Sequence, residues 1–237
     1  SESDDGFKLG GTTLPFLKST TVHQEYNASP QRAPEIAVPV RSDTHTERPS
    51  LLITPSAQAP LDQTATSDPI EFGSRLKLKG KVDDRDYGDA MHRILAAEIQ
   101  NPEHPERIAR ATRILAHWDL QKSVTPEQAL AASDRYREWV QTTFSPISQH
   151  VEVPFTSHTA DGQQASGFID HLIVTANGPV IIDHKSYQGK LSDQPAKAAS
   201  YSGQLALYKK VVAASYPAPP ATWIHFISTG TAIEVSR

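Results

Sequence analysis

The 237-residue chain contains no cysteine. This absence excludes disulfide bridges, zinc sites built on thiolates, iron–sulfur clusters and a cysteine nucleophile. The sequence also lacks a run of 18 apolar residues that could cross a membrane, and its acidic first residues do not resemble a signal peptide. We therefore expect a cytoplasmic protein. Because the chain begins with Ser1 rather than Met, we also expect a piece of a longer polypeptide.

The sequence also lacks an excess of basic over acidic residues. The formal net charge is −4, from 23 Lys and Arg against 27 Asp and Glu. None of the segments 1–80, 81–150 and 151–237 has more basic than acidic residues. A domain that binds DNA unaided normally carries a basic surface. If this chain meets nucleic acid, metal ions or a larger assembly must supply much of the positive charge.

The composition changes near residue 80. Residues 1–80 hold 8 of the 18 prolines together with 18 serines and threonines, and no helical period lasts more than one turn. Such a composition predicts an irregular linker, or a segment that wraps around a partner. We place an ordered domain at residues 81–237.

Three helices are predicted at the start of the ordered part. Apolar residues recur at helical spacing over 88–100 and 105–118. The third helix starts at Thr125, because Thr125 and Gln128 match a capping box and Pro126 suits the first helical position.

The apolar period then changes from that of a helix to that of strands. Asn177-Gly178 predicts a hairpin, and a helix is expected over 196–214. Five strands are predicted, at residues 150–156, 166–175, 180–185, 223–228 and 232–235. This order predicts an α/β (α+β) fold, with a mixed central sheet flanked by helices.

Two acidic residues interrupt apolar strands. Asp170 lies in the strand 166–175, and Asp183 lies in the strand that the hairpin places beside it. A buried carboxylate costs several kcal/mol unless it is paired, protonated or bound to a metal. Strand alternation puts Asp183 and Lys185 on one face, so a buried Asp–Lys ion pair is one interpretation. The other is a divalent-cation site, which the second acid across the hairpin favours.

Four short motifs follow one another from residue 88 to residue 208. Gly88 to His92 has the pattern Gly-x-x-x-His, and Gln204 to Tyr208 has the pattern Gln-x-x-x-Tyr. Between them lie Gly167-Phe168-Ile169-Asp170 and Ile182-Asp183-His184-Lys185-Ser186. In kind and order, these motifs resemble the PD-(D/E)xK nuclease superfamily. They resemble most the C-terminal nuclease domain of AddA and RecB helicase–nucleases.

The resemblance implies a restriction-endonuclease-like core that hydrolyses DNA with Mg²⁺ or Mn²⁺. His184 stands where the family usually has Tyr, and Ser186 stands where it has Thr, but only the backbone of residue 184 is needed for metal binding. AddB-like and CRISPR-associated relatives often carry cysteines for an iron–sulfur cluster, so their absence here favours the AddA/RecB side. No P-loop motif is present, so the motor is not in this chain.

Roles follow from the matched positions. The resemblance implies that Asp170, Asp183, the backbone carbonyl of His184 and the His92 side chain bind the metal. Lys185 would act on the nucleophilic water or on the scissile phosphate.

Four further residues are considered beside these ligands and the lysine. Gln204 and Tyr208 share one helical face and would line the site, holding the DNA strand or the catalytic lysine. Glu152 is placed like an acidic residue common in these nucleases, either as an additional metal ligand or outside the ligand set. His171, like His184, alternates away from the acids and is expected to face the opposite layer.

The resemblance implies the nuclease domain of a helicase–nuclease that processes double-strand DNA ends. Its partners would be DNA, as a single strand or a duplex end, the helicase motor of the parent polypeptide and an AddB-like subunit. Three alternatives stay open: a degenerate nuclease fold that binds DNA or a partner, a free-standing restriction-like or repair endonuclease, and a metal hydrolase with another substrate.

Overall fold

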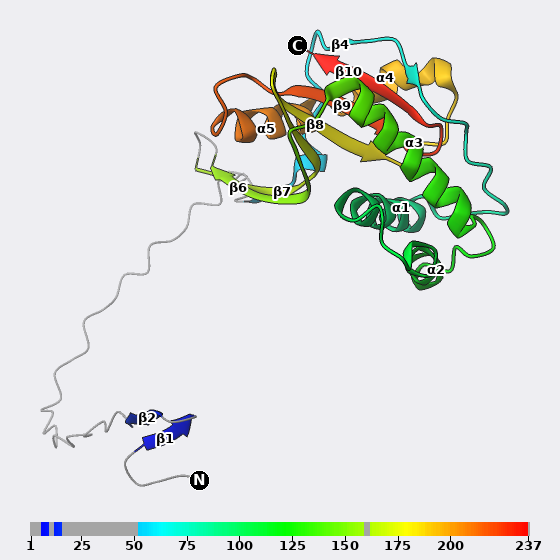
Figure 1. The fold of residues 1–237 in the computed structure, drawn as a ribbon. Coiled ribbons are helices and arrows are strands. Elements are labelled where there is room, and N and C mark those ends of the chain that lie inside the picture. The colour runs from blue at the N-terminus through cyan, green and yellow to red at the C-terminus, as the bar shows by residue number, and fades with distance from the viewer. Residues whose placement is uncertain (1–5, 10–11, 16–51, 159–161, 237) are drawn as a thin grey trace, which may run out of the picture. The chain divides into compact units, whose positions relative to one another are not determined.

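The computed structural model describes residues 6–9, 12–15, 52–158 and 162–236 (Figure 1). The chain divides into two compact units, Ser1–Glu47 and Arg48–Arg237. In the first unit, β1 (Gly6–Leu9) and β2 (Thr12–Pro15) form an antiparallel hairpin. Residues 16–51 of the predicted irregular segment lie outside the described residues.

The second unit is built on a mixed sheet, as predicted. Within the described residues, its eight strands are β3 (Leu52–Ile53), β4 (Ala65–Thr66), β5 (Ile70–Glu71), β6 (Ser148–His158), β7 (Gln164–Thr175), β8 (Gly178–Lys185), β9 (Ala221–Phe226) and β10 (Thr231–Ser236). The main path has the order β3-β7-β8-β9-β10-β4, while β6 pairs with β7 and β5 with β10. β6, β7 and β8 form the predicted antiparallel meander, and β8 and β9 run parallel.

Helices cover the sheet. They are α1 (Asp84–Gln100), α2 (Arg107–His117), α3 (Pro126–Phe144), α4 (Gln194–Ala199) and α5 (Ser202–Ala213). α1 begins before the predicted residue 88, because the Asp83 side chain accepts hydrogen bonds from the next turn of the backbone. The capping box that predicts the start of α3 is confirmed, with Thr125 and Gln128 bonded reciprocally. Among the described helices, none is long and apolar enough to span a membrane.

The two faces of the sheet carry different helices. α1, α2 and α3 lie together on one side (Figure 1). Ile182 of β8 packs in the core beneath these three helices, whereas its neighbour Ile181 packs in a second core with Leu205 of α5. β8 is therefore buried on both faces, which explains its continuous apolar run. A site at the end of β8 can receive side chains from α1 on one face and from α5 on the other.

The prediction of one long helix over 196–214 is wrong. A turn at Ser200 and Tyr201 separates α4 from α5, and the Ser200 hydroxyl donates a hydrogen bond to the Lys197 carbonyl at 2.6 Å. The backbone tightens at this point, because the Tyr201 N–H donates to the Ala198 carbonyl three residues back at 3.0 Å. α5 also packs closely on the segment before α1, since a Cβ added at Gly203 would meet the carbonyl oxygen of Ala59 at 2.0 Å.

Residues 52–80 of the predicted irregular part contribute three short strands to the sheet. β3 adds in parallel to β7, and both β4 and β5 pair with β10. Between them, the Leu61 N–H donates a hydrogen bond to the Ser202 hydroxyl oxygen at 2.8 Å. This segment, from Leu52 to Val82, thus runs across the sheet from one edge to the other before α1 begins.

Candidate active site

The two strand acids lie where β7 and β8 part. The backbone ladder between these strands ends at the pair His171 and Ile182. One step further, the Asp170 carboxylate accepts a hydrogen bond of 2.7 Å from the His184 N–H. A side chain therefore takes the place of a backbone partner beside the second acid, Asp183.

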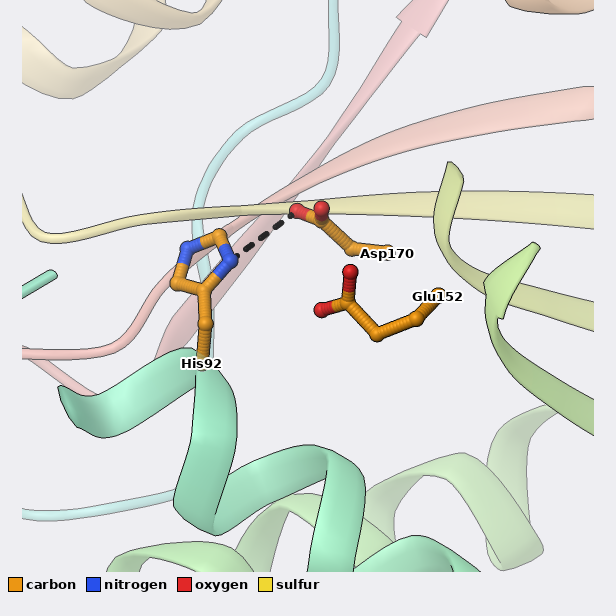
Figure 2. A group of neighbouring side chains, drawn as sticks. All are labelled: His92, Glu152 and Asp170. Atoms are coloured by element: carbon orange, nitrogen blue, oxygen red, sulfur yellow. Dashed lines mark ion pairs between the residues drawn. The ribbon is translucent and has the colours of Figure 1, made fainter. Parts of the chain in front are cut away.

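Asp170 belongs to a group of three possible metal ligands. One ligand atom from each of His92, Glu152 and Asp170 lies within 4.8 Å of the others. Figure 2 shows His92 projecting from α1 toward the carboxylates of Glu152 and Asp170, and His92 Nδ1 lies 3.6 Å from Asp170 Oδ2. Two carboxylates and one imidazole at this spacing fit around a single divalent cation such as Mg²⁺ or Mn²⁺.

Glu152 reaches this group from a strained backbone. Its φ is +51°, in the left-handed region that a side chain with a Cβ rarely adopts. Its neighbours Val151 and Val153 pair with His171 and Ile169, so Glu152 stands opposite Asp170 across β6 and β7. Such a conformation costs about 1–3 kcal/mol and is concentrated at functional sites.

His92 also contacts another predicted ligand. Its Nε2 lies 3.0 Å from the carbonyl oxygen of His184. Because a carbonyl can only accept, Nε2 carries a proton in this bond, and Nδ1 is the ring atom that faces Asp170. The structure thus brings together three of the four groups that the sequence analysis assigned to the metal.

Asp183, the fourth group, lies in a separate network. Its Oδ2 is 2.7 Å from Lys185 Nζ, and its Oδ1 accepts a hydrogen bond of 2.9 Å from Gln204 Nε2. The Gln204 amide also contacts Lys185 Nζ at 3.2 Å and the Tyr208 hydroxyl at 2.8 Å. Gln204, which was expected to hold the DNA strand or the lysine, thus contacts Lys185, and Tyr208 contacts Gln204. The Asp–Lys ion pair of the alternative interpretation is formed.

Burial and neighbouring charges together shift the pKa values of Asp170 and Lys185. It raises the pKa of Asp170 from 3.8 to about 7, although the nearby His92 acts to lower it and Asp183 raises it further. Burial alone would lower the pKa of Lys185, but the adjacent Asp183 charge outweighs it, so that the pKa of Lys185 is raised overall. Lys185 therefore stays a cation, whereas Asp170 needs a further positive charge to stay ionised at neutral pH.

The family model of the PD-(D/E)XK nuclease superfamily matches residues 63–232, which include every residue of both networks. The chain belongs to the PD-(D/E)XK nuclease superfamily. The restriction-endonuclease-like fold class expected from the sequence is thereby confirmed, with its mixed sheet and flanking helices. The comparison with curated proteins gave no match.

A row of buried rings lies behind the superfamily motifs. His171 and His184 face the α1–α3 layer, and His225 of β9 lies beside His184. His184 is thus turned away from Asp183, as expected, whereas Asp170 contacts His92 of α1 and lies on the same side as His171. His225 Nδ1 lies 3.0 Å from His184 Nδ1, and the Tyr136 hydroxyl of α3 lies 2.7 Å from His171 Nδ1. Burial lowers the pKa of both His171 and His225 to about 3, so these two rings are neutral. These rings pack against His184 of β8 on the same side of the sheet as His92.

A cleft of about 700 Å³ opens beside the His92, Glu152 and Asp170 group. Arg93 and Trp118 line it on the helical side, and Phe168 lines it on the strand side. The sequence analysis did not single out these three residues. Phe168 occupies the variable position of the Gly-x-Ile-Asp motif. Its place two residues before Asp170 is the sequence feature from which a position near the site could have been predicted.

Proposed function

We propose that this member of the superfamily is a metal-dependent DNA nuclease. The approach of His92, Glu152 and Asp170 to one another is the observation that supports this most. The Asp183–Lys185 pair on the neighbouring strand adds a fixed cation. Hydrolysis of a phosphodiester needs such a set, with oxygen ligands for a hard cation and a positive charge for the phosphate.

The ligands that we propose for Mg²⁺ or Mn²⁺ are Asp170, Asp183, the His184 carbonyl and His92. Glu152 joins them as an additional ligand, because its carboxylate points into the same group. A bound divalent cation polarises the phosphate and lowers the pKa of a bound water, which supplies the nucleophile. The negative charges at the site would repel DNA phosphates, so we expect DNA binding to require the cation.

Lys185 is proposed to act as a positive charge and not as a base. Its ammonium is held between Asp183, Gln204 and the ring of Tyr201, whose centroid lies 4.6 Å from Nζ. Its raised pKa keeps it protonated at neutral pH. From this position it orients the attacking water and stabilises negative charge on the phosphate. Gln204, fixed by Tyr208, positions this lysine.

We further propose an AddA/RecB-type role, as the nuclease domain of a helicase–nuclease that processes DNA ends. The four motifs and their order support this assignment. The net charge of −4 is consistent with a motor and an AddB-like subunit that would hold the DNA for this domain.

The test is cleavage of end-labelled DNA by the 237-residue chain with Mg²⁺ or Mn²⁺. We expect cleavage that disappears in Asp183→Ala and in Lys185→Ala, with losses of at least about a hundredfold. Asp62→Ala and Lys190→Ala change exposed residues of the same types outside the site and serve as matched controls. Equal activity in all variants would refute the proposed site.

One observation favours a second candidate, a degenerate module that binds DNA or a partner. The Asp183 carboxylate is already neutralised by Lys185 and hydrogen-bonded by Gln204. Calorimetric titration with Mn²⁺ separates the two candidates when no cleavage is seen. Binding that is lost in Asp170→Asn supports the nuclease, which would then depend on its motor, whereas no binding supports the degenerate module.

A further inference from the structure

Phe168 stands apart from the other exposed apolar side chains of the second unit. In the described ranges, six large hydrophobic side chains are exposed, and Phe168 is the aromatic one among them, with 57 % of its surface accessible. It belongs to neither hydrophobic core of the described residues. It is also the one of the six that lines the cleft beside the His92, Glu152 and Asp170 group.

The position of Phe168 on β7 relates its ring to the site. Phe168 and Asp170 are two residues apart on one strand, so both side chains leave the same face. Two residues span about 7 Å along a strand. The ring is thus displaced from the carboxylate by roughly the length of one nucleotide in an extended strand, on the cleft side of β7.

The rest of the cleft supports an extended polymer more than a small ligand. α1 lines this cleft with the small side chains Ala96 and Ala97 together with the exposed Arg93. Arg93 lines the same cleft as His92, so the cleft that contains the proposed metal group also carries a positive charge. A phosphate backbone can pass along the helical side while its bases turn toward the strand side.

An exposed aromatic face binds an unpaired base and has little to bind on a duplex. In double-stranded DNA, both faces of each base are covered by its neighbours, and only base edges and phosphates are exposed. In single strands the faces are free, and stacking on an aromatic side chain is tolerant of sequence.

We propose that Phe168 stacks on an unpaired base next to the scissile phosphate and so makes single-stranded DNA the preferred substrate of this site. This inference rests on the proposed nuclease function, because the occupant of the cleft is the strand to be cut. Phe168 sets specificity through the base, whereas the acids and Lys185 act on the phosphate.

The experiment measures binding and cleavage separately. A single-stranded oligonucleotide with one 2-aminopurine, and its duplex, are titrated with the full chain in Ca²⁺, by fluorescence quenching and anisotropy. The variants are Phe168→Ala, Phe168→Tyr and the control Ile147→Ala, which removes an even more exposed apolar side chain outside the cleft. The same proteins are then assayed for cleavage with Mn²⁺.

We expect Phe168→Ala to bind single strands about tenfold more weakly and to lose quenching, with little change for the duplex. Phe168→Tyr keeps the ring and should keep both properties, and Ile147→Ala should match the wild type. Equal losses for single strands and duplex, or no loss at all, would overturn the inference, as would a wild type that does not bind single strands. Failure of the nuclease function has a different signature, because the wild type then quenches 2-aminopurine but cuts neither DNA.

Discussion

Asp170 and Asp183 are the same residue type on neighbouring strands, yet their surroundings differ. Asp183 has its own cation, Lys185, at 2.7 Å, and an amide from Gln204 on its other oxygen. Asp170 faces a histidine and a second carboxylate, Glu152, and burial raises its pKa. The fold therefore neutralises one acid internally and leaves the other to be neutralised from outside. Because Asp183 and Gln204 already hold Lys185, the lysine is in position before a metal ion binds.

Removing the charge of Lys185 is the strongest test of this difference between Asp183 and Asp170. Lys185→Met leaves the Asp183 carboxylate, which is only 2 % exposed, without its ion-pair partner. We expect a loss of about 3–5 kcal/mol in the free energy of unfolding, measured with urea. Adding Asp183→Asn to Lys185→Met should recover most of that loss. A change smaller than about 1 kcal/mol would show that the pair is not the internal compensation described here.

The pH dependence of stability should distinguish the two acids next. In EDTA, the folded pKa of Asp170, about 7, lies above its ordinary value of 3.8, so folding favours the protonated acid. Its contribution to stability is complete below about pH 4 and is lost as the pH rises toward 7. The Asp170→Asn side chain stays neutral at every pH. The free energy of unfolding of this variant should therefore rise relative to that of the wild type between about pH 4 and 7, by several kcal/mol at most. Urea unfolding at each pH measures it, and a constant difference would contradict it.

A bound cation should compensate the charge of the Asp170 carboxylate and so stabilise the folded protein. At a Mn²⁺ concentration of about a hundred times the dissociation constant, the wild type should gain about 2.7 kcal/mol of stability. Glu152→Gln and Asp170→Asn should gain much less. The corresponding change in melting temperature is read by calorimetry, with Asp62→Ala as the control. A full gain in both variants would place the cation elsewhere.

The smallest expected effect concerns the backbone of Glu152. Glycine accepts the φ of +51° without a steric penalty, so Glu152→Gly should stabilise the metal-free protein by up to about 1 kcal/mol. Glu152→Gln keeps the strain and should show no such gain, although both variants lose the carboxylate. Urea unfolding in EDTA compares them. A Gly variant less stable than the Gln variant would mean that the turn of the backbone is not strained.

Local signals predicted the elements of this fold well. The capping box at Thr125 and the Asn177-Gly178 turn act over a few residues, so the sequence shows them directly. The strand acids were equally visible, because a carboxylate in an apolar run is a local anomaly. The break between α4 and α5 was not, because apolar residues at helical spacing continue on both sides of the tight turn at Ser200 and Tyr201.

The division of the site between its two acids was visible only in part. Alternation led to the Asp183–Lys185 ion pair as one interpretation, but it did not show that Asp170 would lie apart from it, with His92 and Glu152. Glu152 was placed near the site without a definite role, because its position opposite Asp170 depends on the register of β6 and on a left-handed backbone. Such long-range geometry becomes visible only when the strands are aligned.

The segment from Leu52 to Val82, which crosses the sheet, limits where the chain can be truncated. β10, near the end of the described chain, has its outer edge covered by β4 and β5, which precede it by some 160 residues. A truncation that starts at α1 would expose that row of free backbone groups, inviting strand addition between molecules. We therefore expect aggregation of truncated forms during expression to depend on residues 65–71 more than on the acids.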